Sequence, residues 1–329
     1  MKTRRFAVMA GGALCAVLSS VAVVPLHAAD FPTKSITMVV PYPPGGPTDI
    51  VARTLAASME KTLKQPVVIE NTSGAGGTVG SAKVARSPND GYWLLLNNIG
   101  MATTPSLYRA LAYKPDDFSP VGLVATMPAV IIARKDLPAN NLDELLAYIK
   151  KDPSKVNYGH SGIGSAAHLC GLLYQSAIQA RVTTIAYKGA APAMNDIMSG
   201  QFDFMCEQTS STVPFVESGR VKAMAVTSKQ RLAQLPNVPT TIESGLPALD
   251  IGVWHGVYAP KGTPKDIVER LSAAIGVALR DPAVQKRYAE IGAVIATPEE
   301  GRPEPLMKLQ QSEAARWAPI IKAAAEYAD

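Results

Sequence analysis

The segment from Met38 to Val51 constrains the fold most strongly, because an apolar strand passes through a proline- and glycine-rich turn directly into a helix. Ile36 to Val40 is a short β-branched run followed by turn residues, which is the pattern of a buried strand. Pro47 suits the first turn of a helix, with Thr48 or Asp49 as its cap. The segment therefore predicts a strand–turn–helix unit.

The turn in this unit is suited to an anion. Gly45 and Gly46 lack a Cβ atom, so the backbone can bend sharply and present bare N–H groups to a ligand. The N-terminus of the following helix adds a partial positive charge. A single unit of this kind is more often a plain connector in α/β proteins, so one such loop does not establish a site.

The same order of elements recurs along the chain. The apolar runs Val67–Glu70 and Tyr92–Leu96 each end in a loop that contains asparagine and glycine, and a second set starts at Ala129–Ala133. That second set includes the glycine-rich loop His160–Ser165, with Ser165 as the expected N-cap of a helix. Alternating strands and helices predict an α/β fold with parallel sheets, in which ligands bind beyond the carboxyl ends of the strands.

The first 29 residues predict a cleavable secretory leader. Lys2, Arg4 and Arg5 precede a long run of small and apolar residues, and a small-residue cleavage site follows at Ala28 or Ala29. A membrane anchor is the alternative interpretation of this run. We expect an exported, periplasmic protein.

Charge and size narrow the class of protein. The chain has 32 Lys and Arg residues against 27 Asp and Glu, and three of the cations lie in the expected leader, so the mature chain carries +2. This balance favours neither nucleic acid nor an anionic membrane surface as a partner. The roughly 300 mature residues suggest about two domains.

Cys170 and Cys206 are the two cysteines of the mature chain. In an oxidising periplasm they could form a disulfide, whereas two small buried thiols are the other interpretation. The sequence leaves both open.

Known catalytic and cofactor motifs do not fit. Gly162 to Ala167 matches the G-x-G-x-x-A pattern of dinucleotide sites, but no Asp or Glu occurs between Ser165 and Asn195 to hold a ribose. The chain contains no phosphate-binding G-x-x-x-x-G-K-[ST], no H-E-x-x-H and no G-x-S-x-G. We therefore expect neither a nucleotide cofactor nor a metal.

The remaining candidates for chemistry are isolated polar residues. His160, His168 and His255 show no metal-ligand spacing, and a capping or structural role is the simpler interpretation for each. Asp203 and Glu207 lie at the end of one expected strand and could accept hydrogen bonds from a ligand. Several glycine-rich loops without a nucleophile beside them favour binding over catalysis.

The chain resembles the Bug family, the extracytoplasmic solute receptors of tripartite tricarboxylate transporters. The resemblance covers nearly the whole mature chain in the family's order. It is carried by the following segments: Pro41–Asp49, Asn71–Gly77, Asp90–Tyr92, Gly162–His168, Tyr187–Gly189, Gly200–Asp203, Leu235–Thr240, Trp254–Gly256 and Ala259–Pro264.

The family's fold is the type II periplasmic-binding-protein fold, with two α/β lobes, a hinge and a ligand cleft between the lobes. The resemblance implies a first lobe of residues 30–128 and 253–329 and a second lobe of 129–252. It also implies that loops of both lobes hold a ligand carboxylate. The residues that it assigns to this site are Tyr42, Gly45, Gly46, Asp49, Asn97, Met101, Ser161, Gly162, Gly164, Ser165, Lys188, Gly189 and Glu207.

The resemblance also implies a function. We expect a monomeric, non-enzymatic receptor that captures a di- or tricarboxylate or an aromatic carboxylate such as terephthalate and delivers it to the inner-membrane transporter subunits. The alternatives are an exported carboxylate-processing enzyme and a binding module that serves a membrane sensor. Glu207 stands where the family more often has Asp, so the identity of the carboxylate stays open.

Overall fold

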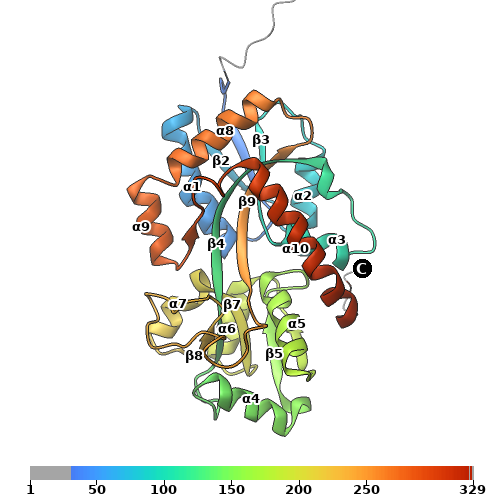
Figure 1. The fold of residues 1–329 in the computed structure, drawn as a ribbon, viewed down its shortest axis with the longest axis vertical. Helices are drawn as coiled ribbons and strands as arrows, with labels where there is room; N and C mark the ends of the chain where they lie inside the picture. Colours follow the sequence, from blue (N-terminus) through green and yellow to red (C-terminus); the bar gives the residue numbers. More distant parts are fainter. Residues whose placement is uncertain (1–30, 326, 328–329) are drawn as a thin grey trace, which may run out of the picture.

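The computed structural model describes residues 31–325 and 327. The expected leader and its cleavage site lie outside the described residues. Two lobes are stacked along the long axis of the molecule and are joined by β4 (Phe118–Arg134) and by the chain returning into β9 (Gly252–Pro260) (Figure 1). Within the described range, no helix is both long and apolar enough to cross a membrane.

The 17-residue strand β4 belongs to both lobes. Up to Pro128 it pairs with β9, and from Ala129 onward it pairs with β7 and β8. Because the partners of β4 change after Pro128, we propose a division into lobe 1 (30–128 and 253–329) and lobe 2 (129–252).

Lobe 1 contains the strand order β2-β1-β3-β9-β4, with β10 on β4. The pairs of β1 with β2 and with β3 are parallel, whereas β9 runs antiparallel to both β3 and β4. The other strands of this lobe are β1 (Ile36–Val40), β2 (Val67–Asn71), β3 (Trp93–Asn98) and β10 (Val294–Ile295).

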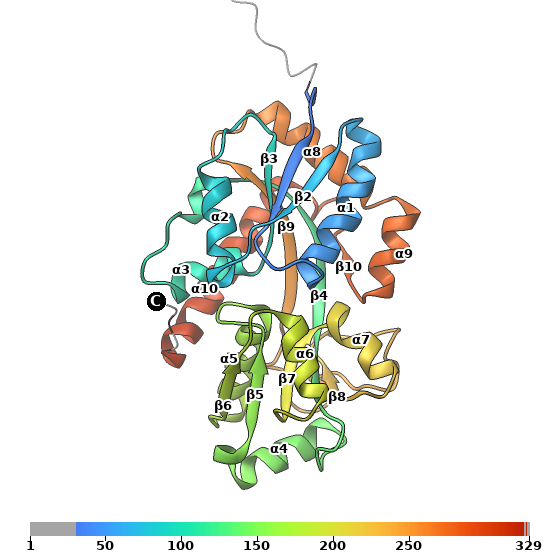
Figure 2. The same cartoon turned by 180° about the vertical axis from the view of Figure 1, so that it is seen from behind.

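Helices cover both faces of this sheet (Figures 1 and 2). Val51, Leu55 and Met59 recur at every fourth position of the first helix and are fully buried, so the apolar stripe fixes its orientation. The last three helices return to this lobe, where α8 packs on α1 and α10 packs on α3 and β4. The helical segments are α1 (Pro47–Leu63), η2 (Ala75–Gly77), α2 (Thr78–Ala85), α3 (Gly100–Leu107), η3 (Pro115–Asp117), α8 (Lys265–Ala278), α9 (Pro282–Glu290) and α10 (Pro303–Ala324).

Lobe 2 repeats the same principle on a smaller sheet. The short strands β5, β6 and β7 pair in parallel, and β4 runs antiparallel beside β7 and β8. Its elements are α4 (Leu142–Lys151), η4 (Pro153–Lys155), β5 (Asn157–His160), α5 (Ala166–Ile178), β6 (Thr183–Ala186), α6 (Ala190–Met198), β7 (Phe204–Gln208), α7 (Thr209–Glu217) and β8 (Val221–Val226).

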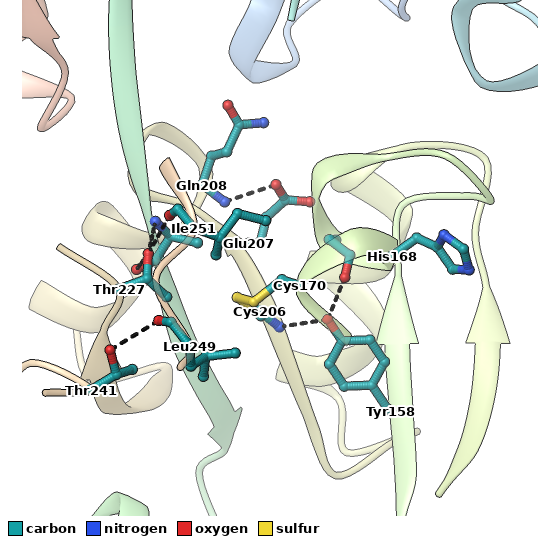
Figure 3. The surroundings of a disulfide bond; sticks show 12 residues. Tyr158, His168, Cys170, Cys206, Glu207, Gln208, Thr227, Thr241, Leu249 and Ile251 are labelled. Atoms are coloured by element: carbon teal, nitrogen blue, oxygen red, sulfur yellow. Dashed lines mark hydrogen bonds between the residues drawn. A yellow bond between two sulfur atoms is a disulfide. The ribbon is translucent and has the colours of Figure 1, made fainter. Parts of the chain in front are cut away.

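A disulfide joins Cys170 in α5 to Cys206 in β7, with a Cα–Cα distance of 6.0 Å (Figure 3). Of the two interpretations that the sequence left open, the structure therefore shows the paired one. The bond ties α5 to the strand that carries Glu207.

Two expectations about local structure were wrong. The sheets are mixed and not purely parallel, because β9 and β4 run against their neighbours. The N-cap of α1 is Gly46, not Thr48 or Asp49, and no side chain caps it. The Asp49 side chain instead accepts a hydrogen bond from the backbone N–H of Gly45.

Candidate ligand-binding cleft

The turn between β1 and α1 is held by Asp49. One carboxylate oxygen accepts hydrogen bonds from Gly45 N–H at 2.8 Å and from Arg53 Nε at 2.9 Å, and the other accepts from Asn71 Nδ2 at 2.9 Å. Burial raises the pKa of Asp49, but these hydrogen bonds outweigh that effect and keep the pKa below its usual value. Asp49 is therefore an ionised anchor that shapes the turn from behind.

Tyr42 connects this turn to the carboxyl end of β3. Its hydroxyl donates to Asn98 Oδ1 at 2.9 Å and lies 3.1 Å from Asn97 Oδ1. Burial raises the pKa of Tyr42 well above its usual value, so the hydroxyl stays protonated and remains a donor. Asn98 Oδ1 also accepts from Gly100 N–H, which fixes the start of α3.

A second chain of hydrogen bonds supports the same region from the core. Asn98 Nδ2 donates to Thr48 Oγ1 at 3.2 Å, and Thr48 Oγ1 lies 3.3 Å from His255 Nε2 on β9. Burial lowers the pKa of His255 to about 3, so its ring is neutral at physiological pH. His255 is thus part of the scaffold beneath the cleft.

Lobe 2 presents three loops towards lobe 1. The first leads from β5 into α5, where Ser165 Oγ accepts from His168 N–H at 3.1 Å, which confirms the predicted N-cap. The second leads from β6 into α6, with Gly189 as N-cap in a conformation of positive φ that favours glycine. The third is the end of β7, where Gln208 is the N-cap of α7.

Glu207 lies at the end of β7 and is 2% exposed. Its Oε1 accepts from Gln208 N–H at 2.8 Å, and its Oε2 accepts from Ser161 Oγ. Burial raises the pKa of Glu207, and the hydrogen bonds from Ser161 and Gln208 oppose that rise in part.

A cavity of about 670 Å³ lies between the two lobes, and residues of both line it. Its lining includes the N-cap residues of five helices: Gly46 of α1, Gly77 of α2, Ser165 of α5, Gly189 of α6 and Gln208 of α7. Each helix N-terminus carries a partial positive charge, and the cavity is also lined by Lys188. The electrostatic field of these helices therefore favours an anion.

The two lobes touch at the cleft. A Cβ atom placed on Gly76 of lobe 1 would lie 2.8 Å from the carbonyl oxygen of Ile163 in lobe 2. Similarly, a Cβ atom on Gly189 would lie 3.5 Å from Cγ of Pro43. Glycine at these positions allows the loops to approach closely.

The structure divides the thirteen residues expected at the site into two groups. One group lines the cavity: Tyr42, Gly46, Ser161, Gly162, Ser165, Lys188, Gly189 and Glu207. The other five residues do not line it: Asp49, Asn97, Met101 and Gly164 are buried, and Gly45 is exposed at the turn. As ligand contacts, all thirteen stay predictions.

Several lining residues were missed from the sequence. Tyr108, Tyr187 and Gln208 line the cavity, as does the loop Ser73–Gly77. The Ser73–Gly77 loop carried a signal, because its glycines follow a strand directly. Gln208 gave no such signal, because Pro214 interrupts the sequence pattern of α7, the helix that Gln208 caps.

Asp203 and Glu207, the two carboxylates considered for catalysis, do not lie next to each other. Asp203 precedes β7, at the opposite end from Glu207, and accepts hydrogen bonds from Arg134 Nε and from Asn157 N–H. Cys170 is bonded to Cys206 and is not a free thiol. Among the residues that the structure describes, no group of three or more His, Cys, Asp or Glu side chains could hold a metal ion.

Comparison with known proteins places the chain in a family. A sequence model described as "Tripartite tricarboxylate transporter family receptor" (TctC) matches residues 51–325. A curated relative from Agrobacterium vitis, the UPF0065 protein in the TAR-I ttuE-ttuC' intergenic region, is 44% identical over 295 residues, covering 89% of this chain and 85% of the relative.

Solved structures agree with that assignment. The periplasmic binding protein BugD is 46% identical with a TM-score of 0.85, covering 90% of this chain and 99% of BugD. MatC from Rhodopseudomonas palustris with bound malate is 39% identical with a TM-score of 0.84, covering 88% of this chain and all of MatC. A further R. palustris protein, solved with adipate, is 33% identical with a TM-score of 0.85, covering 90% of this chain and 99% of that protein. The fold is the periplasmic-binding-protein fold expected from the sequence, and the chain belongs to the TctC family of tripartite tricarboxylate transporter receptors, which includes the Bug proteins.

Proposed function

We propose that the protein is a periplasmic receptor that captures a small organic carboxylate between its lobes and delivers it to the membrane subunits of a tripartite transporter. The observation that carries this proposal is the convergence of five helix N-caps from both lobes on one cavity. Charge-assisted hydrogen bonds from backbone N–H groups are each worth about 1.5–3 kcal/mol, so a carboxylate bound by both lobes stabilises their contact.

Two relatives support the ligand class. MatC was solved with malate and another R. palustris protein with adipate, and both are carboxylates. A cavity of about 670 Å³ has room for ligands of this size. Candidates for this chain are di- and tricarboxylates and aromatic carboxylates.

A thermal-shift screen of the mature protein against a carboxylate panel tests binding. We expect saturable stabilisation by at least one carboxylate, with an increase that follows ligand concentration. The same samples are then analysed by NMR for ligand turnover. Recovery of unchanged ligand supports a receptor, whereas consumption of the ligand would instead support the exported enzyme.

Substitution at Gly46 tests the site itself. Gly46 lines the cavity and has φ −79°, a value that any residue adopts. Gly46→Leu should therefore fold, and its side chain should block part of the cavity beside the first-lobe turn. We expect loss of carboxylate binding with little change in the melting temperature without ligand. Gly276→Leu in α8, where a Cβ atom has no neighbour nearer than 3.7 Å, is the matched control. Unchanged affinity in Gly46→Leu would remove this turn from the site.

A cell-based measurement separates transport from sensing. Deletion of the receptor gene should abolish uptake of the radiolabelled carboxylate that the screen identifies. Normal uptake combined with loss of a transcriptional response would instead favour a binding module for a membrane sensor.

A further inference from the structure

The cavity wall formed by Glu207 and Gln208 differs in character from the rest of the cleft. Both residues line the cavity, and they are 2% and 4% exposed. Figure 3 shows the Gln208 side chain pointing from the end of β7 towards lobe 1, with the Glu207 carboxylate beside it. A carboxylate inside an anion-binding cleft is unfavourable unless the ligand interacts with it.

Glu207 has more capacity to accept hydrogen bonds than its neighbours use. An ionised carboxylate offers about four lone-pair positions. In the described part of the chain, the Ser161 hydroxyl and the backbone N–H of Gln208 donate to this carboxylate, and neither is a cation. Glu207 can therefore accept a further donor, charged or neutral.

Gln208 supplies a second acceptor. Its side chain lies beside the Glu207 carboxylate (Figure 3) and carries a carbonyl oxygen that can accept a hydrogen bond. Within residues 31–325 and 327, this Oε1 atom is buried and has no hydrogen-bond partner. A buried acceptor without a partner costs about 1–3 kcal/mol, which a ligand donor would remove.

We propose that the ligand carries a hydrogen-bond donor, a hydroxyl or an ammonium group, close to its carboxylate, and that Glu207 and Gln208 Oε1 accept from it. The inference rests on the proposed receptor function and names the substrate class as hydroxy or amino carboxylates. Ser165, the N-cap of α5, lies on the same short loop as Ser161, which bonds Glu207, so a ligand carboxylate at this helix N-terminus would lie near Glu207. A carboxylate without such a donor would leave Gln208 Oε1 buried without a partner and the spare acceptor capacity of Glu207 unused.

Matched ligand series test this specificity. Isothermal titration calorimetry of the mature protein compares propionate with lactate and alanine, succinate with malate and aspartate, and glutarate with 2-hydroxyglutarate and glutamate. In at least one series the hydroxy or amino member should bind about tenfold or more tightly than the plain acid, the discrimination expected when a site would otherwise keep polar groups unpaired. A hydroxyl and an ammonium donor are told apart by which member of the series binds.

Two substitutions identify the residues responsible. Glu207→Gln keeps the shape of the side chain but removes its charge, so the preference for an amino member should fall by about tenfold, and that for a hydroxy member by less. Gln208→Met removes the second acceptor and should lower the preference for either donor. Glu217→Gln, the same charge change at an exposed position in α7, is the control and should change nothing.

The outcomes separate this inference from the proposed function. Equal or tighter binding of the plain acids, or an unchanged preference in both variants, overturns the donor subsite while receptor function stands. Absence of binding throughout the three series also overturns it, and the broader carboxylate panel then decides whether the receptor function fails as well.

Discussion

Gly76 of lobe 1 and Ile163 of lobe 2 meet across the cleft so closely that a Cβ atom on Gly76 would lie 2.8 Å from the Ile163 carbonyl oxygen. The same atom would lie 2.5 Å from the Tyr108 hydroxyl. Gly76 also has φ +61°, which glycine adopts at no cost. This contact makes the approach of the two lobes dependent on the absence of one methyl group.

Gly76→Ala should therefore weaken ligand binding by about tenfold, since a strain of about 1–3 kcal/mol would act on the arrangement with the lobes in contact. Calorimetric affinity for a panel carboxylate, together with the radius of gyration from small-angle scattering, measures the effect. Gly200→Ala is the control, because Gly200 has φ +78° but no atom within 4 Å of its Cβ position. Equal affinity in both variants would show that this contact does not limit closure.

Tyr42→Phe should reduce both stability and affinity. The variant removes the donor shared by Asn97 and Asn98, and the loss of one buried hydrogen bond costs about 1 kcal/mol. Urea unfolding measures the stability, and calorimetry measures the affinity. Tyr288→Phe, which loses a buried bond to the Val51 carbonyl in α1, should lose similar stability without the effect on affinity. If both variants bind the ligand equally well, the Tyr42 hydroxyl does not position the residues that line the cleft.

Loss of the disulfide should lower the free energy of unfolding by about 3–4 kcal/mol, the chain-entropy estimate for a closed loop of this size. The bond joins residues separated by 36 positions and ties α5 to β7. Chemical denaturation of the Cys170→Ala/Cys206→Ala double variant measures this. A reducing agent should destabilise the wild type but leave the double variant unchanged, and the opposite pattern would contradict the pairing.

Local patterns predicted much of the fold. The N-cap Ser165 was predicted from residues within one turn of it, and the structure confirms it. The cleft's glycine loops were located in the same way, because each follows a strand directly. Features that depend on the pairing of residues far apart in the chain could not be predicted from the sequence. Among these, β4 reads as separate runs because Pro120, Gly122 and Pro128 interrupt it, and only its partners show that it is continuous.

The choice between neighbouring residues also depended on distant pairing. Asn97 and Asn98 end β3, and the Oδ1 atoms of both lie within hydrogen-bond distance of the Tyr42 hydroxyl. Of the two, Asn98 lines the cavity, whereas Asn97 donates to Ser81, and the placement of β3 among its neighbours decides this. The pairing of the two cysteines was likewise undecidable until α5 and β7 were placed together.

His255 should make stability depend on pH below neutrality. Burial lowers its pKa to about 3 in the folded protein, against an ordinary value near 6.5 in the unfolded chain. The unfolded state therefore binds a proton more readily between these values, so the free energy of unfolding falls as the pH falls below about 6.5. Between pH 7 and pH 5 this residue should account for a loss of about 2 kcal/mol.

Urea unfolding at both pH values, compared with His255→Asn, isolates this contribution. The variant removes the titrating ring and keeps a polar side chain beside Thr48, the partner of His255 in the scaffold under the α1 N-terminus. Between pH 7 and pH 5, the free energy of unfolding of the variant should fall by about 2 kcal/mol less than that of the wild type, because the remaining groups titrate equally in both proteins. Burial raises the pKa of Glu207, so that carboxyl group favours the folded state as the pH falls and opposes the effect in both. Parallel pH profiles would mean that His255 takes up a proton within the folded protein. They would contradict a neutral His255 ring beneath the cleft.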